Sequence, residues 1–394
     1  MIAFREKLKD LDNLSDLHKA CVLPYAKRMI GFYIDVFNYL PKIVDKGPDK
    51  KKIVKTIKEI KDKHECEHYK RLLKPLLAKK AWLKNEEDLV NLIRRDNYLT
   101  PAKNHTAISI ALADLLLNFE AIICFDFCDD PIAKTTVYEG WKTTYAPVNF
   151  LLGQIFDYEE WFLKLPVKGN WGPYQMVMAM DIRSCPYCNR QYTFSLVDVA
   201  GKKKGRPELD HFLPKSRNPL LALTFYNLVP SCKGCNSTSL KGNTDTSYEK
   251  HLSPYEINQR NGAMRFTYKP ETYEASIGNS EELAISLSFG GDPANKILKK
   301  KVNGNIKMFA LDEIYENHTD IVQEIIKKRH DSSDRYIQTL QQTFKNFPVS
   351  VEDAYRLAFG NYYHEKDFHK RPLAKLVKDI AIELKTLVKH KPKK

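Results

Sequence analysis

Two cysteine pairs constrain the fold of this chain more than any other feature of its sequence. They are the stretches Cys185–Cys188, with sequence CPYC, and Cys232–Cys235, with sequence CKGC. A C-x-x-C turn can point two thiolates at one ion, and two such turns complete the tetrahedral coordination that Zn²⁺ prefers. Four thiolates leave no open coordination position, so we predict a structural zinc site. The alternative is four unrelated buried cysteines.

The chain has eight cysteines, which also bear on the cellular compartment. Its first residues, MIAFREKLKDLD, are charged and lack the apolar core of a signal peptide. We therefore expect a cytoplasmic protein, in which cysteine pairs indicate metal binding or catalysis before disulfides. The apolar run from Ala107 to Phe127 is interrupted by Asp114, Glu120 and Asp126. This run predicts a core helix, and no membrane contact is expected.

The net charge of +14 over 394 residues favours a polyanionic partner. An ordinary surface rich in lysine is the alternative. The length suits two or three domains. We predict an α+β protein with a basic helical region at residues 1–175, a strand-and-turn region at 176–260, and a mixed then helical region at 261–394 that ends in a basic tail.

The periodicity of apolar residues gives the main elements. The predicted helices are Asp16–Val44, Leu311–Phe344 and Pro372–Val388, together with the lysine-rich stretch Lys46–Lys84. The predicted strands are Gln191–Val199, Pro207–Leu213, Met264–Tyr268 and Leu283–Phe289.

The 43 residues between the two cysteine pairs exceed the usual zinc-ribbon spacing, so they contain an insertion. Within it, the stretch Glu208–Ser216 (ELDHFLPKS) places Asp210 beside His211 at the end of a short strand. A carboxylate can hold a hard divalent cation, and an imidazole can deprotonate water near neutral pH. Strict alternation along a strand would point these two side chains apart, so the strand must twist or end here.

The order of four short motifs, CPYC, LDHFLPKS, NLVPSC and KGCN, resembles the zinc-knuckle branch of the HNH endonuclease superfamily. The resemblance implies a ββα-metal nuclease core within residues 176–260. That core would have strands at Pro207–Leu213 and Phe225–Ser231 and a helix starting near Gly234. The implied activity is hydrolysis of phosphodiester bonds in DNA, with RNA as the alternative substrate.

The same resemblance assigns roles to four residues. His211 matches the general base of the family, and Asp210 matches the first ligand of the catalytic metal. Asn227 matches the asparagine that ties down the loop and orients the base. Asn236 matches the second metal ligand. Oxygen ligands favour Mg²⁺ or Mn²⁺ at this site, apart from the structural Zn²⁺.

Basic residues around these motifs are expected to contact phosphates of a bound nucleic acid. The family has a lysine three residues after the last metal ligand, where this chain has Ser239 and then Lys241. The candidate phosphate contacts are Lys202, Lys203, Lys204, Lys215, Arg217 and Lys241.

The stretch Asn218–Asn227 (NPLLALTFYN) adds a finer resemblance, to the HNH effectors of Septu-type and retron-linked antiphage systems. Those effectors work beside an ATPase of the ABC type. The resemblance therefore implies a role in antiphage defence and an ABC-type ATPase as partner.

Two other functions compete with the nuclease. The first is a non-catalytic zinc-ribbon protein that binds nucleic acid, although a binder needs no base beside a carboxylate. The second is an interaction subunit whose nuclease stays silent until a partner releases it. A further motif, His64–His68 (HECEH), fits the zinc-protease pattern, but its charged neighbours favour a solvated helix face.

Overall fold

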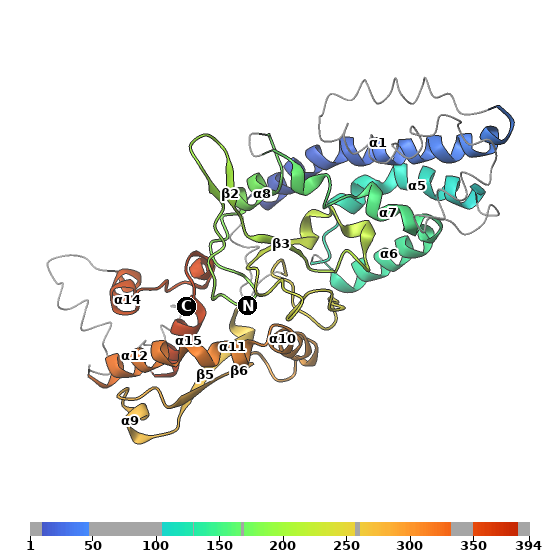
Figure 1. Ribbon diagram of the computed structural model, residues 1–394. Coiled ribbons are helices and arrows are strands. Elements are labelled where there is room, and N and C mark those ends of the chain that lie inside the picture. The colour runs from blue at the N-terminus through green and yellow to red at the C-terminus, as the bar shows by residue number, and fades with distance from the viewer. Residues whose placement is uncertain are drawn as a thin grey trace.

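The computed structural model describes residues 10–46, 105–128, 130–166, 169–256, 261–331 and 350–384. Residues His64–His68, most of Lys46–Lys84 and the basic tail lie outside these ranges. The described part is an α+β protein of mainly helices with three two-stranded antiparallel sheets. Figure 1 shows the N-terminal helices at one end, the pair β5 and β6 with its helices at the other, and β3 between them.

The N-terminal region is helical, as predicted. Its helices are α1 (Leu11–Lys46), α5 (His105–Ile123), α6 (Pro131–Thr144), α7 (Asn149–Ile155) and α8 (Pro173–Met180). The 3₁₀ turns η3 (Ala146–Val148) and η4 (Phe162–Lys164) join them.

Helices α1 and α5 pack side by side and bury apolar side chains between them. Val22 and Met29 of α1 and Leu112 and Leu115 of α5 are fully buried. Helix α5 covers most of the apolar run predicted to be a core helix, so that prediction is confirmed. Among the residues that the structure describes, no helix is long and apolar enough to cross a membrane.

The central region contains four short strands and two 3₁₀ turns. The strands are β1 (Leu196–Val197), β2 (Lys203–Gly205), β3 (Glu208–His211) and β4 (Leu228–Ser231), and the turns are η5 (Pro219–Leu221) and η6 (Phe225–Asn227). Strand β1 pairs with β2, and β3 pairs with β4. Strands β1, β3 and β4 are shorter than predicted, because 3₁₀ turns and loops replace their outer residues, whereas β2 lies where no strand was predicted.

The helix predicted to start near Gly234 is not found. Residues 233–243, all of which the structure describes, form consecutive turns. Gly234 and the run Ser237–Ser239 have low helix propensity, and Gly242 adopts a left-handed φ of 42° that ends any helix. The ββ part of the expected ββα core is therefore present, and a turn segment replaces its helix.

The C-terminal region begins with a two-stranded sheet. It contains η7 (Asn261–Ala263), β5 (Met264–Pro270), α9 (Tyr273–Ser276), β6 (Leu283–Phe289), α10 (Lys296–Met308), α11 (Leu311–Tyr315), η8 (Glu316–His318), α12 (Thr319–His330), α14 (Val351–Phe359), η9 (Glu365–Lys370) and α15 (Ala374–Glu383). Strand β6 has the predicted bounds, and its alternate residues Leu283, Ile285 and Leu287 are buried against the helices.

One apolar cluster joins residues from all three predicted regions, from Leu11 in α1 to Ala381 in α15. Buried polar contacts reinforce it. The His18 imidazole of α1 contacts the Leu223 carbonyl, and Trp171 donates a hydrogen bond to the other ring nitrogen of His18. The central strands are thus packed between helices of the N-terminal and C-terminal regions. The domain boundaries stay a prediction.

Candidate metal centre and catalytic cleft

The four predicted cysteines come together in space. Their sulfur atoms all lie within 4.8 Å of one another, and all four residues are buried. The Sγ atoms of Cys188 and Cys232 are 3.9 Å apart. Two sulfurs bound at about 2.3 Å to one tetrahedral zinc ion lie about 3.8 Å apart, so this spacing fits zinc. The structure therefore confirms a four-cysteine cluster that could hold a metal.

The surroundings of the sulfurs also suit a bound cation. The backbone N–H of Arg190 donates to Cys188 Sγ, and that of Cys235 donates to Cys232 Sγ, each at 3.4 Å. Such donors stabilise thiolates. Burial raises the pKa of the Cys185 thiol well above its ordinary value, so a thiolate at this position needs a neighbouring positive charge. A zinc ion would supply that charge.

Asn189 anchors the first cysteine pair to the C-terminal region. It adopts a left-handed φ of 50°, which asparagine tolerates, and its side chain is buried. The amide nitrogen donates to the carbonyls of Phe368 and Arg371, and the amide oxygen accepts from the Lys375 backbone N–H. The turn that carries Cys188 is therefore fixed from outside the central region.

The β3–β4 pair brings the candidate catalytic residues next to this cluster. Asp210 pairs with Val229 and His211 pairs with Leu228 across the two strands. Strand β4 ends at Ser231, directly before Cys232. The second cysteine pair thus continues the strand that lies beside Asp210 and His211.

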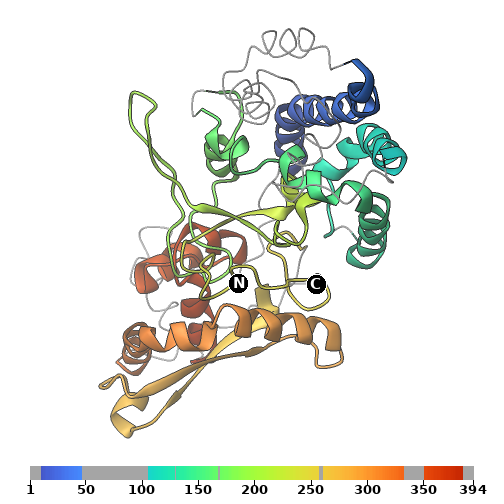
Figure 2. The same ribbon diagram turned by 45° about the vertical axis from the view of Figure 1, so that its right-hand side comes forward.

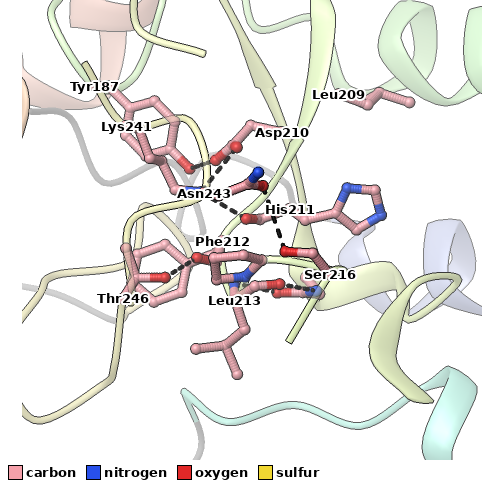
Figure 3. A network of polar contacts seen from close by, with 12 residues as sticks. Tyr187, Leu209, Asp210, His211, Phe212, Leu213, Ser216, Lys241, Asn243 and Thr246 are labelled. Carbon is pink, nitrogen blue, oxygen red and sulfur yellow. Dashed lines mark hydrogen bonds and ion pairs between the residues drawn. The ribbon is translucent and has the colours of Figure 1, made fainter. Parts of the chain in front are cut away.

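Asp210 lies in a buried polar network (Figure 3). Tyr187, from the first cysteine pair, donates a hydrogen bond of 2.6 Å to Asp210 Oδ2. The Lys241 ammonium lies 2.9 Å from Asp210 Oδ1 and donates to the His211 carbonyl oxygen at 2.7 Å. The side chains of Lys241 and Asp210 are 0% and 3% exposed. Tyr187, which lies between two cysteines of the cluster, therefore directly contacts the candidate metal ligand Asp210.

The position of Lys241 differs from the one predicted. A phosphate contact needs an ammonium group at the surface, but this group is fully buried and paired with a carboxylate. The sequence contained only a weak signal of this, namely the absence of a lysine at the family's usual position, Ser239. The predicted contact between Lys241 and phosphate is therefore corrected to an internal ion pair.

His211 ends β3 and points away from the Asp210 carboxylate (Figure 3). Its Nε2 lies 2.9 Å from the Ala222 carbonyl oxygen, and its ring packs edge-on against Tyr158. A carbonyl can only accept, so Nε2 carries the proton and Nδ1 keeps a free lone pair. Burial lowers the pKa of His211 to about 3, which favours the neutral imidazole.

Asn227 ties together the loops on both sides of His211. Its Oδ1 accepts from the Leu213 backbone N–H at 2.7 Å, and its Nδ2 donates to the carbonyls of Leu213 and Leu221. Leu221 directly precedes Ala222, whose carbonyl holds the imidazole. Asn227 therefore orients His211 through the loop and does not contact its ring, which agrees with a positioning role.

A cleft of about 260 Å³ gathers the remaining candidates. Asp210, His211, Asn236 and Lys215 all line it, although Asn236 is 25 residues from His211 in the chain. The cleft is also lined by residues to which the sequence motifs assigned no role, namely Tyr158, Glu159, Leu163, Glu208, Leu209, Pro214, Thr238, Gly242 and Asn243. Glu208 was accessible to prediction, since a residue two positions before Asp210 shares its strand face.

The oxygen atoms in the cleft suit a hard divalent cation. An ionised carboxylate offers about four lone-pair positions, and Tyr187 and Lys241 occupy two of those on Asp210. The Asp210 carboxylate therefore keeps acceptor positions beyond these two contacts, and Asn236 lines the same cleft. Carboxylate and amide oxygens are ligands that Mg²⁺ and Mn²⁺ prefer.

The other predicted phosphate contacts lie at the surface in exposed or loosely paired positions. Lys215 pairs with Glu159 at 2.8 Å, and Arg217 pairs with Asp245 at 3.4 Å. Such exposed pairs contribute little and can exchange for a phosphate. Lys202 and Lys204 are exposed, whereas the Lys203 ammonium donates to the Leu165 carbonyl.

Comparison with known proteins gives one partial match. A segment of 101 residues is 34% identical to Septu protein PtuB of Bacillus thuringiensis, and it covers 25% of this chain and 35% of that protein. No family model and no solved structure matches the chain. The comparison therefore shows similarity to part of a Septu protein.

Proposed function

We propose that this protein is a metal-dependent HNH-type endonuclease that hydrolyses phosphodiester bonds in DNA. The observation that carries the proposal is the cleft, where Asp210, His211 and Asn236 meet beside a four-cysteine cluster. The residues that the resemblance implies as base and metal ligands are thus neighbours in space.

His211 acts as the general base of the proposed reaction. Its Nε2–H is held by the Ala222 carbonyl, so Nδ1 accepts the proton of the attacking water. The negative charge of a phosphodiester bound in the cleft raises the low pKa of the buried imidazole towards the range useful for a base. Asn227 keeps the ring in place through the Leu221–Ala222 loop.

Asp210 and Asn236 would hold Mg²⁺ or Mn²⁺. When bound, the ion stabilises the additional negative charge of the transition state and the leaving oxygen. Tyr187 and Lys241 hold the Asp210 carboxylate in place through two hydrogen bonds. Lys215, which lines the cleft, and the surface residues Arg217 and Lys202 would contact flanking phosphates.

The proposed biological role is antiphage defence, supported by the partial similarity to a Septu protein. The finer sequence resemblance adds an ABC-type ATPase as the proposed partner. Co-purification of the two proteins after co-expression from neighbouring genes would test that partnership.

A non-catalytic, zinc-stabilised nucleic-acid binder is the second candidate. The ion pair of Asp210 with Lys241 favours it, because an ammonium group 2.9 Å away weakens the attraction of the carboxylate for a second cation. The two candidates differ in one property, which is bond cleavage.

The test is a cleavage assay on the purified full-length protein. Supercoiled plasmid and a structured RNA are incubated with protein dialysed against a mild chelator, and then with added Mg²⁺ or Mn²⁺. The nuclease proposal expects nicking and linearisation of plasmid only when the cation is present. Retention of plasmid by the protein without cleavage under every condition would support the binder instead.

A further inference from the structure

A short arm next to the catalytic cleft carries exposed apolar side chains on one face. The arm is formed by residues 191–205, and it protrudes from the body in two views (Figures 1 and 2). Tyr192, Phe194 and Leu196 are 52%, 49% and 58% exposed, whereas Thr193 between them is buried and donates to the Ile182 carbonyl. Alternation along an extended segment places the three exposed side chains on one face.

The two aromatic rings of this face stack on each other at the surface. The ring centroids of Tyr192 and Phe194 are 4.7 Å apart, and their planes differ by 20°. Single exposed apolar residues are common, but a contiguous group that includes two parallel rings marks a binding surface. A flat ligand can extend this stack.

A second cleft adjoins the stack. It has a volume of about 310 Å³, and Phe194, Met178 and Arg183 are among the residues that line it. This volume is at the lower end of the range for small-ligand pockets, about 300–1,000 Å³, which suits one planar group such as a nucleobase.

The charge around the stack selects a polyanion as the ligand. Lys202 and Lys204 are exposed at the end of the arm, and Lys204 makes only a surface ion pair of 3.5 Å with Asp198. Aromatic rings beside lysines form the usual binding surface for single-stranded nucleic acid, whose bases expose their faces. A duplex hides those faces and offers only base edges in its grooves.

The arm is also connected directly to the catalytic cleft. Strand β2 ends at Gly205, and β3 with Asp210 begins three residues later. The five residues from Gly205 to Asp210 span at most about 18 Å even when fully extended. Gly205 pairs with Leu196, which is two residues from Phe194, so the stacked rings lie within about 30 Å of Asp210. A nucleic-acid strand bound to the rings can therefore reach the cleft within several nucleotides.

We propose that Tyr192 and Phe194, with Lys202 and Lys204, form a base-stacking site for single-stranded nucleic acid. The site binds the unpaired strand and directs it to the neighbouring cleft. Only this second part rests on the proposed nuclease function.

The test measures binding separately from cleavage. A fluorescent oligothymidine of about 16 nucleotides and a duplex of the same length are titrated with full-length protein by anisotropy, without added divalent cation. We expect tighter binding of the single strand. Substituting Tyr192→Ala and Phe194→Ala together should weaken that binding by about 5- to 150-fold, which corresponds to the loss of one stacked base.

Two variants control for other effects. Tyr273→Ala removes an aromatic side chain that is 73% exposed in the distant C-terminal region, and it should leave binding unchanged. Exchanging the two rings by Tyr192→Phe with Phe194→Tyr should retain binding, because both side chains still stack. Equal melting temperatures would show that each variant is folded.

The outcomes separate this inference from the nuclease proposal. Binding that depends on the two rings, without cleavage when Mg²⁺ is added, would support the site and reject the nuclease. Cleavage with unchanged binding in the double variant would reject the site and leave the nuclease standing. Tighter binding of the duplex than of the single strand would also reject the site. The site would likewise be rejected if the two rings were needed for a protein–protein contact and not for oligonucleotide binding.

Discussion

The buried ion pair between Lys241 and Asp210 allows a quantitative prediction about stability. In Lys241→Met the Asp210 carboxylate stays buried and keeps only the hydrogen bond from Tyr187. Breaking a buried pair by removing one partner costs about 3–5 kcal/mol, because the remaining charge has lost its compensation. For a large cooperative unit this corresponds to a fall in melting temperature of about 6–20 °C.

A double-mutant cycle shows whether the loss comes from the pair itself. Asp210→Asn should also destabilise the protein, since it leaves the ammonium group uncompensated. The double variant should be more stable than the sum of the two single changes implies, by at least about 2 kcal/mol. Lys142→Met, which breaks an exposed pair with Glu139, should cost less than about 1 kcal/mol.

Urea denaturation and thermal melting are the assays for all four variants. The reasoning is refuted if Lys241→Met is as stable as Lys142→Met. It is also refuted if the effects of Lys241→Met and Asp210→Asn add to within about 0.5 kcal/mol, since independent sites behave in that way.

Three further predictions concern the metals and the pH dependence. Cys232→Ser should lose one bound zinc per chain by elemental analysis and lower the melting temperature, whereas Cys128→Ser, at a buried cysteine outside the cluster, should keep its zinc. Asn236→Ala should raise the Mg²⁺ concentration needed for half-maximal cleavage, and an unmoved titration would remove this residue from the ligand set. Burial lowers the pKa of His18 from 6.5 to about 4, so below pH 6.5 the unfolded chain takes up a proton that the folded chain does not. Because of this proton, the free energy of unfolding should fall by about 1.4 kcal/mol for each pH unit as the pH is lowered from 6.5 to about 4. Urea denaturation of His18→Gln at several pH values should show a dependence of this free energy on pH that is smaller by that amount.

The sequence was sufficient to predict contacts that depend on spacing and residue type. The two C-x-x-C turns predicted the cysteine cluster, since each turn points two thiols towards one position and two such turns complete a tetrahedral site. The motif order predicted that Asp210, His211 and Asn236 lie close together, and all three line the same cleft. Strand β3 followed from the residue pattern and β4 from the family resemblance, and both are shorter than expected.

Contacts that depend on long-range packing were not predictable in this way. No sequence motif assigned a role to Tyr187, which lies between two cysteines and donates a hydrogen bond from its hydroxyl to Asp210. Lys241 was predicted to contact phosphate, but the folded turn segment 233–243 places its ammonium group in the interior. No sequence motif predicts the role of the Ala222 carbonyl, which fixes the His211 tautomer, because a backbone atom has no residue-type signature. Its position depends on the turn η5 and on the hydrogen bonds of Asn227.

The most direct test of the central claim is the cleavage rate of His211→Ala. Wild type, His211→Ala and the control His330→Ala, which changes an exposed histidine at the end of α12, are compared on supercoiled plasmid with Mg²⁺. Equal zinc content and melting temperature establish that all three are folded. The account predicts that His211→Ala cleaves about 10²- to 10⁴-fold more slowly and still binds DNA, while His330→Ala matches wild type. Cleavage by His211→Ala at the wild-type rate would contradict the account.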